Sequence, residues 1–248
     1  MTAMLTLLAS GADCERVRAA WLAQPVNAWS SLAFLVAGAW IMLRALRGDH
    51  GRTPELAAFA VAVASNAAGS FLYHGVRTPG THWLHDMGIY AVLGFVAVHD
   101  AGTVRGWPRR RIFWWWGGVL AVTGVVRAAA PGATDAISAA LAVAAALGEF
   151  AAMRAGLRPR ASDGFSLHLA AWLLAVSALV MGGVSFLLGS SVSPLCAPDS
   201  AMQWHAAWHV LQALAMAAYA YAAVELWSPA EAPERFRRSF PGSARGKG

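Results

Sequence analysis

Seven apolar stretches, each near the roughly 20 residues that a helix needs to cross a bilayer, constrain this fold more than any other feature of the sequence. They lie at about 27–43, 56–75, 83–103, 112–129, 133–153, 165–189 and 203–226. None shows the alternating pattern of a barrel strand, and short connections rich in Gly, Pro and Arg separate them. Because a lipid-exposed backbone must satisfy its own hydrogen bonds, we predict an all-α, integral membrane bundle of seven transmembrane helices.

The composition excludes an ordinary soluble protein. Of the 248 residues, 58% are hydrophobic and 13% are charged, whereas a soluble domain carries about 25% charged residues. The net charge of +6 does not indicate a nucleic-acid partner, because the basic residues lie in short loops between apolar stretches. We interpret residues 1–227 as one membrane domain and the polar residues 228–248 as a disordered cytoplasmic tail.

The basic residues also predict the orientation of the chain. One side of the bundle collects fifteen: Arg44, Arg47, Arg52, Arg105, Arg109, Arg110, Arg111, Arg154, Arg158, Arg160 and five in the tail. The other side has four: Arg16, Arg18, Arg77 and Arg127. Since cytoplasmic loops are enriched in Lys and Arg, we expect the N-terminus outside and the C-terminus in the cytoplasm. We therefore expect an integral, multi-pass membrane protein, located in the inner membrane if the cell is bacterial.

Five polar side chains lie at one depth in three of the predicted helices. With this topology, Ser70, His74, Asp86, His205 and His209 all fall within roughly 10 Å of the outer ends of their helices. Ionisable residues inside a span are costly and usually mark a functional site. We therefore expect a reaction centre on the non-cytoplasmic side.

The residue types indicate metal chemistry. His205 and His209 are spaced i, i+4, which lets both imidazoles reach one ion. With His74 as a third ligand, three histidines leave one zinc position open, as in catalytic sites. Asp86 can then take a proton from water, and Ser70, one turn from His74, can donate a hydrogen bond to a developing oxyanion.

Each of these residues also has a structural interpretation. A histidine in a span often forms only a hydrogen bond between helices. Ser70 can bond back to its own helix, and Asp86 can be a carboxylate stabilised at a helix N-terminus. We interpret His82 and His85 as interfacial residues, with metal ligation as the less favoured alternative. We expect Glu149 to pair with Arg154 or to extend toward the membrane surface.

Three sequence blocks carry a resemblance to a known family. They are "DCE" at 13–15 with "NAWSS" at 27–31, "GSFLYH" at 69–74 with "HD" at 85–86, and "QWHAAWH" at 203–209. In this order they resemble the alkaline ceramidases, within a superfamily of seven-span hydrolases that includes the adiponectin receptors. The resemblance implies a zinc amidase that cleaves ceramide to a sphingoid base and a fatty acid.

The same resemblance implies roles for particular residues. His74, His205 and His209 would hold zinc, Asp86 would orient or deprotonate the water, and Ser70 would assist at the carbonyl. Animal members also have an acidic calcium site near the N-terminus, of which Asp13 and Glu15 are a remnant here. Because Gln24 stands where an acid is expected and Val17 where asparagine is usual, we do not expect tight calcium binding.

Cys14 and Cys196 both fall on the predicted outer side, where disulfides persist. We expect them to form a disulfide, with two free thiols as the alternative, and the family places cysteines similarly. The expected partners are the bilayer and a membrane lipid substrate, ceramide or another N-acyl lipid. Two other functions stay open: a zinc hydrolase of a different acyl lipid, and a receptor-like seven-span protein without enzymatic activity.

Overall fold

The computed structural model describes residues 13–47, 53–159 and 166–225. Within them, seven helices are long and apolar enough to cross a membrane. They cover Pro25–Arg47, Pro54–Val76, Pro79–Val104, Arg109–Ala129, Pro131–Arg154, Leu167–Leu188 and Trp204–Val224. The predicted all-α membrane bundle is thus confirmed, with each predicted span matched to within a few residues at its ends.

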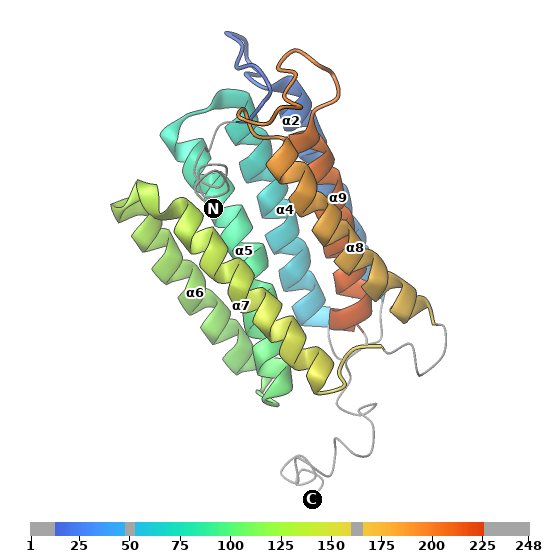
Figure 1. Ribbon diagram of the computed structural model, residues 1–248. Helices are drawn as coiled ribbons and strands as arrows, with labels where there is room; N and C mark the ends of the chain where they lie inside the picture. The colour runs from blue at the N-terminus through green and yellow to red at the C-terminus, as the bar shows by residue number, and fades with distance from the viewer. Residues whose placement is uncertain (1–12, 48–52, 160–165, 226–248) are drawn as a thin grey trace, which may run out of the picture.

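The described helices follow one another along the chain as Figure 1 shows. Their bounds are α2 (Pro25–Ser30), α3 (Leu32–Arg47), α4 (Thr53–Val76), α5 (Pro79–Val104), α6 (Arg109–Ala129), a 3₁₀ turn (Pro131–Ala133), α7 (Thr134–Arg154), α8 (Leu167–Leu188), α9 (Trp204–Tyr219) and a π-helical turn (Ala220–Glu225). Helices α2 and α3 together make the first span. Local chemistry starts two of the helices: Thr78 and Thr81 form a capping box before α5, and the Ser166 hydroxyl accepts from the Leu169 amide before α8.

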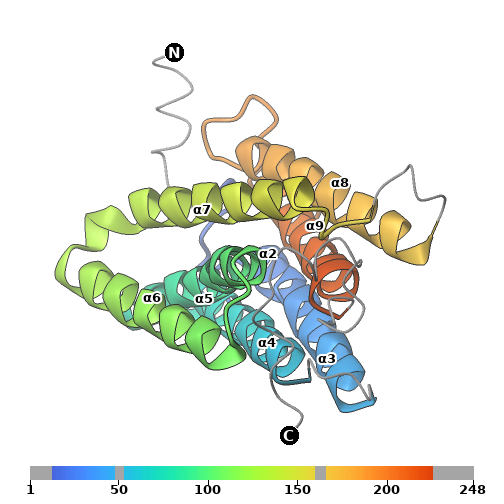
Figure 2. The ribbon, with the colours of Figure 1, turned by 90° about the horizontal axis from the view of Figure 1, so that it is seen from below.

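Three helices form the centre of the bundle. Half or more of the most apolar window of α4, α5 and α9 is buried, at 50%, 56% and 50%. The same fraction is only 11% in α6 and 17% in both α7 and α8. Figure 2 shows α6, α7 and α8 at the outside of the bundle. Their exposed faces are apolar, as expected for helices that contact lipid tails.

The middle of the bundle is an apolar core. Phe59 of α4 packs on Phe95 of α5 and Tyr219 of α9, with ring centroids 4.9 and 5.7 Å apart. Phe34 and Ile41 of α3 are buried beside them. This core fills the centre of the bundle with apolar side chains.

Two glycines bring α4 and α5 into close contact. A Cβ atom on Gly69 would lie 2.5 Å from the Leu84 carbonyl oxygen, and one on Gly88 would lie 2.6 Å from the Asn66 Cα. A larger residue at either position would push the two helices apart. This approach sets the end of α4, which carries Ser70 and His74, against the first turns of α5.

A small cap covers the end of the bundle at which α4 ends and α9 begins. Cys14 and Cys196 form the disulfide suggested by the sequence, and the Cys14 amide donates to the Gly189 carbonyl at 2.8 Å. Arg16 makes two hydrogen bonds of 2.7 Å to Asp199, which lower the pKa of that carboxyl below its usual value. The residues before α2 are thus fixed to the loop between α8 and α9.

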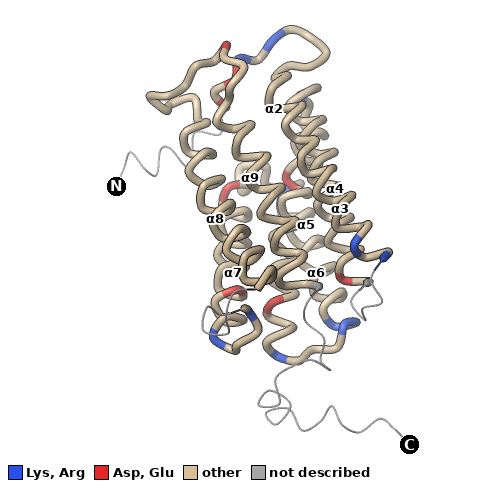
Figure 3. Tube along the Cα trace, turned by 90° about the vertical axis from the view of Figure 1, so that its right-hand side faces the viewer, with Lys and Arg blue, Asp and Glu red and all other residues tan. Residues whose placement is uncertain are grey.

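Most of the basic residues lie at the opposite end of the bundle, as Figure 3 shows for the described residues. Arg105 directly follows α5, Arg109 to Arg111 begin α6, Arg154 ends α7 and Arg158 follows it. This distribution agrees with the one counted from the sequence. Which end faces the cytoplasm stays a prediction.

Candidate metal centre

Three buried histidines meet beneath the cap. His74 lies in the last turn of α4, and His205 and His209 lie in the first two turns of α9. One ring nitrogen of each lies within 4.8 Å of those of the other two. Among the His, Cys, Asp and Glu side chains of the described residues, these three histidines form a group that could hold a metal ion.

The Nε2 atoms of these histidines lack adequate hydrogen-bond partners. His74 Nε2 and His205 Nε2 are buried and have no hydrogen-bond partner among the described residues. His209 Nε2 has only the Ser70 hydroxyl, at 3.4 Å. Burying a polar atom unpaired is unfavourable, and an ion bound by these nitrogens would satisfy them. Three imidazole nitrogens with a fourth position open suit zinc.

Each Nδ1 atom, in contrast, faces an oxygen. His74 Nδ1 lies 2.8 Å from Gln24 Oε1, and His205 Nδ1 lies 3.2 Å from Asp13 Oδ1. His209 Nδ1 lies 2.8 Å from the Ser30 hydroxyl. Metal-ligating histidines commonly donate their second nitrogen to such an oxygen, which leaves the first as a lone pair for the metal.

The Ser30 oxygen beside His209 can only accept a hydrogen bond from that ring. The Ser30 hydroxyl donates to the Asn27 carbonyl at 3.0 Å, so its oxygen can only accept from His209 Nδ1. Asp13 is likewise an acceptor when ionised. The sequence did not predict that Gln24, Ser30 and Asp13 contact the histidines, since these residues have no regular spacing from the three histidines.

Ser70 lies next to the triad, on the face of α4 that the sequence predicted. Its hydroxyl is 2.8 Å from that of Ser31 and 3.4 Å from His209 Nε2. Ser31 donates to the Asn27 carbonyl at 2.8 Å, so Ser70 donates to Ser31 in this arrangement. The side chain is buried at 1% exposure and does not line the cavity described below. Ser70 therefore contacts His209 without bordering the cavity.

Asp86 is buried and held on several sides. Arg127 of α6 forms a short ion pair with its Oδ2 atom, and Thr134 donates to the same oxygen at 3.2 Å. His85 Nδ1 lies 3.3 Å from Oδ1. No hydrogen bond joins Asp86 to a triad histidine among the described residues. The sequence predicted Arg127 only as one of four basic residues on the outer side, whereas in the structure it is buried against Asp86.

His82 and His85 are more than interfacial residues. Both line the same cavity as His74 and Asp86. His82 stacks on Tyr73 with ring centroids 4.7 Å apart, and the His85 ring lies 6.0 Å from that of His74. Neither joins the triad. His85 therefore lies beside both His74 and the Asp86 carboxylate.

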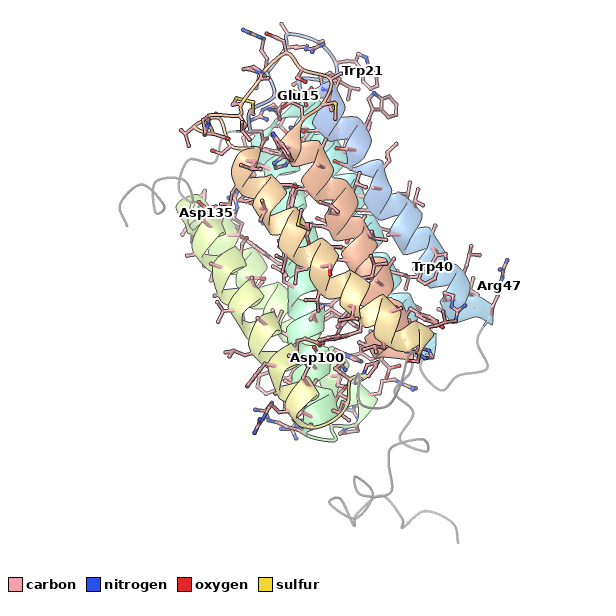
Figure 4. All side chains as sticks on the ribbon, turned by 45° about the vertical axis from the view of Figure 1, so that its right-hand side comes forward. Glu15, Trp21, Trp40, Arg47, Asp100 and Asp135 are labelled. Atoms are coloured by element: carbon pink, nitrogen blue, oxygen red, sulfur yellow. A yellow bond between two sulfur atoms is a disulfide. The ribbon has the colours of Figure 1, made fainter. Side chains whose placement is uncertain are left out.

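A cavity of about 750 Å³ opens onto His74 and His205. Much of its wall is apolar, from Ile89 and Leu93 of α5, Ala142 of α7, Phe186 and Leu187 of α8, and Trp208 of α9. Its polar residues include Asp13, Asp86 and Asp135, and Figure 4 shows Asp135 at the start of α7. Helix α7 packs on α5 while α8 packs on α9, so the cavity lies between two helices that pack on different neighbours.

Asp13 and Glu15, the two acidic residues near the N-terminus, have different contacts. Both oxygens of Glu15 accept from backbone amides at the start of α2, those of Val26 at 2.9 Å and Asn27 at 2.8 Å. Figure 4 shows Glu15 within the cap. Asp13 instead faces His74 and His205. Within the described residues, these carboxylates do not belong to a group of three or more metal-binding side chains.

A second polar cluster lies toward the other end of the bundle. Asp100 Oδ1 accepts from Arg158 and from Tyr219, each at 2.7 Å. Arg158 also donates to Glu149, which accepts from Trp172 at 2.6 Å. Glu149 thus pairs with Arg158, four residues beyond the Arg154 suggested by the sequence. The cluster joins side chains of α5, α7, α8 and α9.

No protein-family model, curated protein or solved structure matches the chain.

Proposed function

We propose that this protein is a membrane-embedded zinc hydrolase that cleaves the N-acyl amide bond of ceramide-like lipids. The observation that carries the proposal is the triad itself. One ring nitrogen of each histidine lies within 4.8 Å of the others, the Nε2 atoms lack adequate partners while each Nδ1 atom faces an oxygen, and two of the histidines border a largely apolar cavity. A bundle stabilised only by hydrogen bonds between histidines would leave no such set of unpaired nitrogens.

His74, His205 and His209 would hold the metal. When bound, zinc supplies Lewis-acid chemistry, polarising a carbonyl and lowering the pKa of water from 15.7 to about 7. The three ligands are neutral imidazoles, which leaves the charge of the ion uncompensated in its first shell. The Asp13 carboxylate, 3.2 Å from His205 and 3.5 Å from His74, offsets part of that charge.

Hydrolysis adds the hydroxyl of water to the acyl carbon and breaks the carbon–nitrogen bond, and the leaving amine takes a proton. We assign the proton transfer to Asp86, through the His85 ring that contacts it at 3.3 Å. Arg127 and Thr134 hold the carboxylate in place. Ser70 serves the acyl oxygen: if its hydroxyl turns from Ser31, it can donate toward the point where the Nε2 atoms meet.

The cavity supports a lipid substrate. Its apolar wall suits an acyl chain, while Asp86, Asp135 and His82 offer hydrogen-bond partners for a polar head. Entry between α7 and α8 would bring the chain directly from the bilayer, from the outer leaflet if the predicted topology holds. The preference for an amide and for ceramide rests on the resemblance of the sequence blocks at 13–31, 69–86 and 203–209.

The test is turnover of defined lipids by the purified protein. Labelled ceramides, other N-acyl lipids and a matched ester are incubated with wild type and with His205→Ala, and fatty acid release is measured. We expect release from an N-acyl lipid by wild type alone. Release from the ester only would make the protein a hydrolase of another acyl lipid. Equal background for both proteins on all substrates would favour a receptor-like bundle and contradict the proposal.

A further inference from the structure

Arg77 has a backbone conformation unusual for its residue type. It follows the last residue of α4 with φ at 53°, and it is the positive-φ residue other than glycine within the described part of the chain. Glycine normally fills such a position after a helix, because a Cβ atom makes the left-handed region unfavourable. A strained residue persists when the surrounding structure holds it there, which makes its side chain worth following.

The Arg77 guanidinium reaches back over the metal centre. Its Nη1 donates to Gln24 Oε1 at 2.6 Å and lies 3.9 Å from Asp13 Oδ2. Its Nη2 lies 3.4 Å from the Tyr73 hydroxyl, and its Cζ lies 4.9 Å from the centre of that ring. Gln24 and Asp13 are the residues whose oxygens face Nδ1 of His74 and His205. One guanidinium therefore contacts the outer partners of two of the three triad histidines.

The contact with Gln24 decides how its amide is turned. Gln24 Nε2 donates to the Glu15 carbonyl at 2.8 Å, while Oε1 accepts from Arg77. A flipped amide would set its NH₂ against the guanidinium and its oxygen against the Glu15 carbonyl, so both contacts would become repulsive. With the amide in this orientation, His74 Nδ1 must be a donor, and its Nε2 lone pair faces the triad.

We propose that Arg77 is a positioning residue of the metal centre: it holds Gln24 and Asp13 so that His74 and His205 present Nε2 to the ion. This inference rests on the metal site of the proposed function and extends it to a residue that touches neither metal nor substrate. The positive φ of Arg77 places its guanidinium next to both Gln24 and Asp13. Charge alone would give the opposite effect, since a cation near a metal site repels the ion.

The experiment measures zinc affinity of the purified, full-length protein by competition with a chelator of known affinity. Arg77→Gly removes the guanidinium and relieves the backbone. We expect the metal-free variant to unfold at the same or a higher temperature than wild type, but to bind zinc about 10- to 100-fold more weakly, the usual effect of losing an outer-shell partner. A merely structural residue would not separate these two readouts. Arg77→Met, which keeps the backbone conformation, should weaken zinc similarly.

Two comparisons sharpen the result. Arg16→Met removes a cation from the same cap, but its partner is the exposed Asp199, so zinc affinity should stay at the wild-type value. The double variant Gln24→Ala with Arg77→Gly should lose less zinc affinity than the two single variants combined, because Arg77 acts partly through Gln24. Unchanged or tighter zinc binding in both Arg77 variants would overturn the inference. A wild type that binds no zinc would instead overturn the proposed function.

Discussion

The orientation of the triad histidines depends on the oxygen atoms that face their Nδ1 atoms. Gln24, Asp13 and Ser30 belong to the short segment before and within α2, yet each faces a histidine 50 or more residues away in the chain. The i, i+4 pair and His74 could be recognised from sequence because helical periodicity places them at one depth. Their outer partners could not, because no regular spacing relates a cap segment to the helices that it covers.

Ser70 gives the most specific prediction at this scale. Ser70→Ala removes the hydroxyl beside His209 Nε2 without touching any Nδ1 contact. We expect zinc content to stay at the wild-type level, while turnover of the best N-acyl substrate falls about 10²- to 10³-fold, the usual cost of one oxyanion donor. Zinc is measured by elemental analysis and turnover by fatty acid release. Full turnover in this variant would show that Ser70 is only a packing residue.

Asp86 is predicted to act on protons rather than on the metal. Asp86→Asn keeps the size of the side chain but removes the carboxylate that contacts His85 and Arg127. We expect zinc binding to be retained and turnover to fall by at least about 10²-fold, within the range for loss of a general acid–base group. Loss of zinc from this variant would show instead that Asp86 supports the metal site.

At the scale of helices, polar side chains connect elements that pack on different neighbours. Helices α7 and α8 border the cavity near one end of the bundle, and at the other end the Trp172 indole of α8 donates to Glu149 of α7. Arg158 joins this pair to Asp100 of α5. Apolar length alone was enough to predict the helices. Their polar connections were not predictable, and the Arg158 contact depends on how the loop after α7 folds back.

Arg158 should therefore matter far more than its neighbour Arg154. Burial opposes the charge of Arg158, but Asp100 and Glu149 raise the pKa of its guanidinium above the ordinary value. Arg158→Met leaves both carboxylates without their cation, so we expect a loss of about 3–5 kcal/mol in unfolding free energy. Arg154→Met, at an exposed position, should change little. Thermal unfolding in detergent compares the two, and equal midpoints would contradict the structural role of the cluster.

For the whole molecule, the sequence predicted seven spans, and the described residues contain seven helices long and apolar enough to form them. Orientation depends on the asymmetry of basic residues and is open to direct test. In wild type both cysteines are paired, so a single introduced thiol can be labelled selectively. We expect Arg110→Cys to react with an impermeant reagent only from the cytoplasmic side and Met202→Cys only from outside. The reverse pattern would invert the topology and move the site to the cytoplasmic leaflet.

The central claim is that His74, His205 and His209 bind zinc. The most direct measurement is the zinc content per chain of wild type and His205→Ala, purified identically without chelators, with Arg16→Met as a control away from the triad. The account predicts close to one zinc per chain in wild type and in the control, and a large loss in His205→Ala. Full zinc occupancy in His205→Ala, or a wild type without zinc after incubation with the metal, would contradict it.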